Sequence, residues 1–132
     1  MEKLYVDGTN NSAELSGITA KLNQDKSIDH VITLGAPTAL IALQAVGQAT
    51  SNAKVVTFDT NPALVTKIKS GQVVWAVDQQ PFLQGYESID SLWLFKVNAN
   101  VIGGGQTVLT GPSFIDSSNI GKVAVYASRG TR

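Results

Sequence analysis

Short apolar runs alternate with longer segments of helical periodicity along most of the chain. Such runs, when apolar at consecutive positions, are typical of parallel strands covered by helices on both faces. The pattern predicts a short strand at Leu4–Val6 and full strands at Val31–Leu34, Lys54–Phe58 and Val73–Val77. Two extended pieces, Thr107–Thr110 and Ser113–Ile115, follow near the end of the chain.

Helix boundaries can be placed between these runs from proline, glycine and capping residues. Asn11, with Glu14 after it, has the capping-box pattern that begins a helix, and Leu15, Ile18 and Leu22 then recur at helical spacing. Prolines at the first turn and glycines after the last turn bound further helices. These helices are expected from Pro37 to Gly47 or Ser51, and over Pro62–Ser70 and Pro81–Asn98. A final short helix is expected over Asn119–Ser128.

Alternation of strands and helices of this length indicates parallel strands joined by right-handed crossovers. We therefore expect one α/β domain covering residues 1–132, a three-layer αβα sandwich with a parallel sheet in the flavodoxin-like order 2-1-3-4-5.

Composition excludes several classes of function. Lys and Arg balance Asp and Glu at 10 each, so no basic surface for nucleic acid is expected. No cysteine is present and His30 is the one histidine, which makes a metal site unexpected. No apolar run approaches the ~20 residues of a membrane span, and the first residues do not form a secretion signal. Residues 103–105 are consecutive glycines, but without the context of a phosphate-binding loop. No nucleophile triad and no cofactor motif is evident, so an enzyme is not expected.

Polar side chains follow two of the predicted strands directly. Asp59 and Asn61 come after one strand, and Asp78, Gln79 and Gln80 after the next. The carboxyl ends of parallel strands are where open α/β sheets bind ligands. A carboxylate accepts hydrogen bonds from hydroxyl groups, and an amide both donates and accepts. We predict that Asp59 and Gln79 converge as ligand-binding residues, although capping or turn roles are the alternative.

Asn61, Asp7 and Asn11 are predicted as lesser neighbours of this site. Each also has a local structural role open to it, because Asn and Asp are favoured in turns and at helix caps. Asn61 in particular is placed to cap the helix that follows it.

Several of these segments together resemble one known family. They are a strand ending in Phe58-Asp59, a helix ending in Ile68-Lys69-Ser70-Gly71, the Gln79-Gln80-Pro81 sequence, and Gly85-Tyr86. This combination resembles the sugar-type (type I) periplasmic binding proteins of ABC importers. The resemblance covers essentially the whole chain and the second half of a family member.

The resemblance implies that a sugar or cyclic polyol lies between two lobes, of which this chain is the C-terminal one. By resemblance, Asp59 and Gln79 bind the ligand, residues 81–110 pack on the first lobe, and the protein is periplasmic. The N-terminal lobe and an ABC permease are the implied partners. The lone lobe is expected to bind weakly or not at all.

Apolar residues of the Pro81–Asn98 helix, among them Tyr86, Ile89 and Trp93, still need burial in a lone lobe. The helix then either folds back on its own sheet or docks on a second copy, and we expect a homodimer.

Alternative functions remain open at this stage. The effector domain of a LacI-type repressor shares the binding-protein fold. A receiver-like signalling domain would use Asp59 as its phosphorylated residue, but it needs a paired acid and a lysine, and only Asp7 is present. A flavin or nucleotide enzyme would need a glycine-rich loop after the first strand, which the chain lacks.

Overall fold

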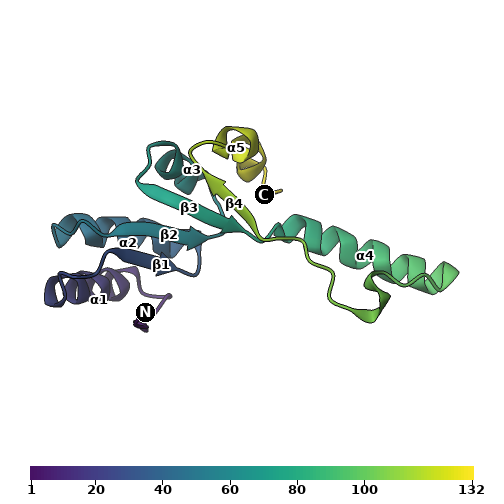
Figure 1. Cartoon of the computed structure of the whole chain (residues 1–132), viewed down its shortest axis with the longest axis horizontal. Helices are drawn as coiled ribbons and strands as arrows, with labels where there is room; N and C mark the ends of the chain where they lie inside the picture. The colour runs from purple at the N-terminus through teal and green to yellow at the C-terminus, as the bar shows by residue number, and fades with distance from the viewer.

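A mixed sheet of four strands lies at the centre of the body of the molecule (Figure 1). The computed structural model describes residues 1–132. The strands are β1 (His30–Thr33), β2 (Lys54–Phe58), β3 (Val73–Asp78) and β4 (Ser113–Asp116), in the order β1-β2-β3-β4. The first three are parallel, whereas β4 pairs antiparallel with β3, so that Asp78 lies opposite Ser113.

Helices cover one face of this sheet. They are α1 (Asn11–Gln24), α2 (Ala36–Gln48), α3 (Pro62–Lys69) and α5 (Ile120–Ser128). Their buried side chains form one apolar cluster with Val55, Val73, Ala76 and Ile115 of the strands. Leu64 and Ile68 of α3 have no exposed surface, so this side of the sheet is a packed core.

Val56 and Val77 lie outside that cluster, although both are buried. Strand side chains alternate between the two faces, so residues next to core positions point to the opposite side. That side carries Ile32 and Phe114, which are 51% and 55% exposed. We call this side, formed by Ile32, Val56, Trp75, Val77 and Phe114, the outer face.

A long helix, α4 (Pro81–Asn98), leaves the carboxyl end of β3 and runs away from the sheet (Figure 1). A glycine turn, η1 (Gly103–Gly105), follows it, and the chain then returns to β4. We call residues 81–112 the arm. None of the residues of α4 is buried, so no side chain of this helix belongs to the core.

The predicted α/β class, with helices flanking a mostly parallel sheet, is confirmed. The predicted strand order 2-1-3-4-5 is wrong. It placed Leu4–Val6, as the first strand, between the strands that are now β1 and β2, but Leu4–Val6 is not in the sheet and β1 pairs directly with β2. The last strand is antiparallel, since the arm brings the chain back to the end of the sheet that it left. The expected second layer of helices is absent from the outer face, which makes the body two-layered.

Two local predictions also need correction. Asn10, rather than Asn11, caps α1: its side-chain oxygen accepts a hydrogen bond from the Ala13 amide at 3.1 Å. Thr107–Thr110 is not a strand, because no neighbouring strand is available to pair with it at this point of the arm.

Asn61 caps α3, as its position before Pro62 predicts. Its side-chain oxygen accepts the Leu64 amide at 2.8 Å, and proline, which lacks the amide proton, fits the first turn. We expect Asn61→Ala to lower the free energy of unfolding by about 1 kcal/mol, because the Leu64 amide loses its partner. Urea denaturation followed by circular dichroism measures this loss. Asn52→Ala, in an exposed loop, is the control and should stay within about 0.5 kcal/mol of the parent. Equal stabilities for the two variants would contradict the capping role.

Candidate functional site

Two polar loops meet where β2 and β3 end. The Asp59 amide donates to the carbonyl of Val77 at 2.7 Å, so the pairing of the two strands continues into the loop after β2. Asp59 itself has a φ of 60°, a left-handed conformation that aspartate tolerates better than most residues. The chain turns sharply here, and the Asp59 side chain stays at the rim of the sheet.

Gln79 reaches Asp59 across this rim. Its amide nitrogen Nε2 lies 3.2 Å from Oδ2 and 3.4 Å from Oδ1 of the Asp59 carboxylate. Gln79 is exposed and Asp59 is half-buried, so both remain open to solvent. The convergence of these two side chains at the carboxyl edge, predicted from the sequence, is therefore present in the fold.

Directly behind Gln79 lies a buried ionic network. Asp78 is 1% exposed and forms an ion pair with Arg132, whose Nε lies 2.8 Å from Oδ2 of Asp78. The other carboxylate oxygen accepts the amide of Gln80 at 2.8 Å. Arg132 also donates from Nη1 to Oε1 of Gln80 at 2.6 Å. This network fixes the backbone on both sides of Gln79.

Gln80 and Gln79 also hold the far end of the arm. The Gln80 side-chain amide donates to the carbonyl of Thr110, and the Thr110 hydroxyl donates to the carbonyl of Gln79 at 3.0 Å. Gln84 donates to the same Gln79 carbonyl at 2.9 Å. Gln80 therefore points toward the arm, whereas Gln79 is left free to face Asp59.

The lesser candidates are separately engaged. Asn61 lies on the loop of Asp59, but its side-chain oxygen is used as the cap of α3. Asp7 accepts hydrogen bonds from the amide and the hydroxyl of Thr9, at 2.9 and 2.6 Å. These bonds favour the charged form and lower the pKa of Asp7 below its ordinary value. No hydrogen bond connects Asp7 or Asn11 to Asp59 or Gln79.

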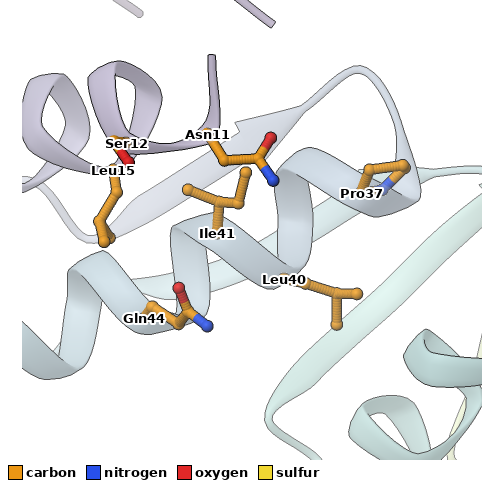
Figure 2. Close-up of a pocket in the computed structure, with 7 residues that line it drawn as sticks. All are labelled: Asn11, Ser12, Leu15, Pro37, Leu40, Ile41 and Gln44. Carbon is orange, nitrogen blue, oxygen red and sulfur yellow. The ribbon is translucent and has the colours of Figure 1, made fainter. Parts of the chain in front are cut away.

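Asn11 lies instead over a shallow pocket between α1 and α2 (Figure 2). The pocket has a volume of about 430 Å³, and apolar side chains of α2 form much of its floor. Its lining residues are Asn11, Ser12, Leu15, Pro37, Leu40, Ile41 and Gln44. Neither Asp59 nor Gln79 is among them, so this pocket is separate from the strand-end site.

Asp59 and Gln79, the pair at the strand ends, can offer a ligand hydrogen-bond donors and acceptors. Asp59 supplies two acceptor oxygens and Gln79 a donor and an acceptor, a set that suits vicinal hydroxyl groups. No cluster of three His, Cys, Asp or Glu side chains occurs that could hold a metal ion. None of the helices is long and apolar enough to cross a bilayer. The hydroxyl of neighbouring Thr60 is buried without a partner, a further polar atom that sequence reasoning missed.

Comparison with known proteins identifies the family of this lobe. A family model described as a periplasmic binding protein domain matches residues 3–96. The chain belongs to the periplasmic binding protein family. The predicted resemblance to one lobe of a type I binding protein is thereby confirmed. Among curated proteins, none matches the chain.

Solved periplasmic binding proteins share the fold of this lobe. A carbohydrate transporter from Acidothermus cellulolyticus 11B, in complex with myo-inositol, is 55% identical with a TM-score of 0.94, covering 98% of this chain and 46% of that one. The myo-inositol binding protein of Caulobacter is 24% identical with a TM-score of 0.70, over 86% and 39% of the two chains. A periplasmic ribose ABC transporter from Conexibacter woesei is 18% identical with a TM-score of 0.78, over 95% and 42%.

This periplasmic binding protein lobe thus spans less than half the length of the solved structures that it matches. Those relatives are solute-binding proteins of ABC transporters rather than enzymes.

Proposed function

We propose that this chain supplies one half of a carbohydrate-binding or cyclic polyol-binding site in a solute-binding protein of an ABC importer. The observation that carries the proposal is the 55% identity, over 98% of this chain, to a carbohydrate transporter in complex with myo-inositol. The contact between Asp59 and Gln79 at the strand ends supports it, because their polar atoms suit ring hydroxyls.

In this proposal Asp59 and Gln79 bind the ligand directly. Each Gln79–Asp59 hydrogen bond is exposed and 3.2 to 3.4 Å long, so it exchanges readily with a ligand hydroxyl. Asn61 and Asp7 act mainly through the turns that they stabilise. Asn11 is assigned no direct contact, because it faces the pocket between α1 and α2.

The remaining groups of the site come from a second lobe. In a complete two-lobed protein, residues 81–110 pack on that lobe, and closure of the two lobes excludes water from the ligand. The complete protein works in the periplasm with an ABC permease. The absence of any buried residue in α4 supports a missing neighbour at the arm.

Alone, the lobe should bind its ligand only weakly. Half of the polar set, left open to water, gains little from each hydrogen bond, and association entropy opposes binding. We expect dissociation constants no tighter than about 1 mM, equivalent to roughly −4 kcal/mol. Isothermal titration calorimetry against myo-inositol, pentoses and hexoses measures this directly.

A two-lobed protein carrying the same lobe is the positive control for these titrations. It should bind at least one of the ligands with micromolar affinity under identical conditions. Micromolar binding by the monomeric lobe alone would contradict the half-site proposal. Failure of the two-lobed protein to bind any sugar or polyol would contradict the proposed ligand class.

A further inference from the structure

The guanidinium group of Arg132 has two partners, which lie on either side of Gln79 in the sequence. Its Nε atom lies 2.8 Å from Oδ2 of Asp78, and its Nη1 atom donates to Oε1 of Gln80 at 2.6 Å. No hydrogen bond or ion pair joins Arg132 to Gln79 itself or to Asp59. Arg132 therefore holds the two residues that flank Gln79 without bonding to either member of the strand-end pair.

The two contacts of Arg132 differ in kind. Nε and Oδ2 of Asp78 are both buried, and neither atom has a hydrogen-bond partner, so their contact is an ion pair in which the N–H group is not aligned with the carboxylate. The aligned donor is Nη1, which is directed at Gln80. A cation of another shape can thus satisfy Asp78, whereas the simultaneous bond to Gln80 needs the second nitrogen of a guanidinium group.

Gln80 has a backbone conformation that its surroundings must enforce. Its φ of 58° lies in the left-handed region, which is unfavourable for a residue with a Cβ atom. Three contacts fix it: the Gln80 amide donates to Asp78, and the side chain accepts from Arg132 and donates to the Thr110 carbonyl. The turn at Gln80 directs its own side chain to the arm and leaves the Gln79 side chain at the rim of the sheet.

The direction of the Gln79 side chain depends on this backbone. The side chain is exposed and bonds only to Asp59, at 3.2 and 3.4 Å. The Gln79 carbonyl, in contrast, is held by the Thr110 hydroxyl at 3.0 Å. The returning end of the arm is in close contact here, because a Cβ atom added to Gly111 would lie 3.2 Å from the Asp78 carbonyl oxygen and 3.8 Å from the Gln79 Cα.

We propose that Arg132 is a positioning residue of the ligand site, which keeps the Gln79 amide against Asp59 by holding Asp78 and Gln80. The proposal rests on the function proposed above, in which this amide binds a ring hydroxyl. A long, exposed glutamine side chain loses its direction when its backbone is freed, and ordering it again on binding costs affinity. Arg132 removes that cost before the ligand arrives.

The first test compares Arg132→Lys with the parent in a two-lobed protein that carries this lobe. Lysine keeps a cation for Asp78, but its single nitrogen cannot also hold Gln80. We expect the Kd for myo-inositol, measured by calorimetry, to rise about 3- to 10-fold, the effect of one neutral hydrogen bond. Arg129→Lys makes the same change on the surface of α5 and should leave the Kd unchanged. Equal Kd values for Arg132→Lys and the parent would overturn the proposal.

The same titrations in a Gln79→Ala background distinguish positioning from a general loosening of the fold. If Arg132 acts through Gln79, then Arg132→Lys should change the Kd no further once Gln79 is alanine, because residues that act through one group are not additive. Gln80→Gly keeps the left-handed conformation and removes the side chain, so it should raise the Kd by the same factor, again only when Gln79 is present. Additive losses in the Gln79→Ala background would contradict the positioning role.

A measurement without ligand separates failure of this proposal from failure of the proposed function. In the ¹⁵N-labelled chain itself, the side-chain amide signals of Gln79, identified by their loss in Gln79→Ala, should move on Asp59→Ala. Arg132→Lys should move them toward the positions of free glutamines, whereas Arg129→Lys should not. Signals that respond to Asp59→Ala but not to Arg132→Lys would refute the positioning role. The expected response, together with no binding of myo-inositol by the two-lobed protein, would support the positioning role and count against the ligand class alone.

Discussion

Arg132→Ala should lower the free energy of unfolding by about 3 kcal/mol, the largest single effect on stability that we expect outside the core. The variant leaves the Asp78 carboxyl group 1% exposed and without its cation. Removing one partner of a buried ion pair is more damaging than replacing both, because the remaining charge cannot recover its hydration. Urea denaturation, monitored by tryptophan fluorescence and circular dichroism, measures the loss.

Arg129→Ala is the matched control for this variant. Arg129 lies over the Tyr126 ring at 5.9 Å on the surface of α5, and its loss should lower stability by at most about 1 kcal/mol. The double variant Asp78→Asn with Arg132→Met removes both charges and should recover part of the stability. If Arg132→Ala were no more damaging than Arg129→Ala, the ion pair would not hold the base of the arm.

Asp59→Ala, introduced into a two-lobed protein that carries this lobe, should weaken sugar or polyol binding about 10- to 150-fold. That range corresponds to roughly 1.5–3 kcal/mol, the contribution of a hydrogen bond to a charged group. Asp59 is half-buried at the rim of the sheet, so its carboxylate meets the ligand with part of its hydration already removed. Calorimetric titration of the parent and the variant with the same ligand measures the ratio.

Asp29→Ala is the control for the binding experiment. Asp29 is an exposed carboxylate beside His30, at the opposite edge of the sheet, where β1 begins. Its removal should leave the affinity unchanged. An unchanged titration for Asp59→Ala, with the fold intact, would refute the assignment of Asp59 to the site. Gln79→Ala should also weaken binding, since its amide is the nearest protein partner of Asp59.

The elements of this fold could be predicted from the sequence because their boundaries depend on neighbouring residues. Lys54–Phe58 and Pro81–Asn98 coincide with β2 and α4, and α3 ends within one residue of its prediction. Proline in the first turn and Gly71 after the last turn of α3 act locally. The adjacency of Asp59 and Gln79 could also be predicted from the sequence, because each residue comes directly after one of two consecutive parallel strands.

Strand order and layers depended on information that local patterns do not carry. Ile32 is an apolar position of the kind that a helix would cover, yet it lies 51% exposed on the outer face. In the sequence, an apolar strand residue that no helix covers gives the same pattern as one that a helix covers. The ion pair of Asp78 with Arg132 joins residues far apart in the chain, and no spacing rule could indicate it.

The base of the arm has a consequence for how this lobe could be rebuilt. Asp78 and Ser113 are paired neighbours on β3 and β4, and Gln80 and Thr110 close the gap between the two strands. In topological terms, β3 and β4 are a hairpin, and the arm is an insertion at its tip. The body therefore tolerates, in principle, any segment whose two ends meet at that spacing, from a tight turn to a foreign domain. The sheet and the strand-end site can in this way be separated from the arm.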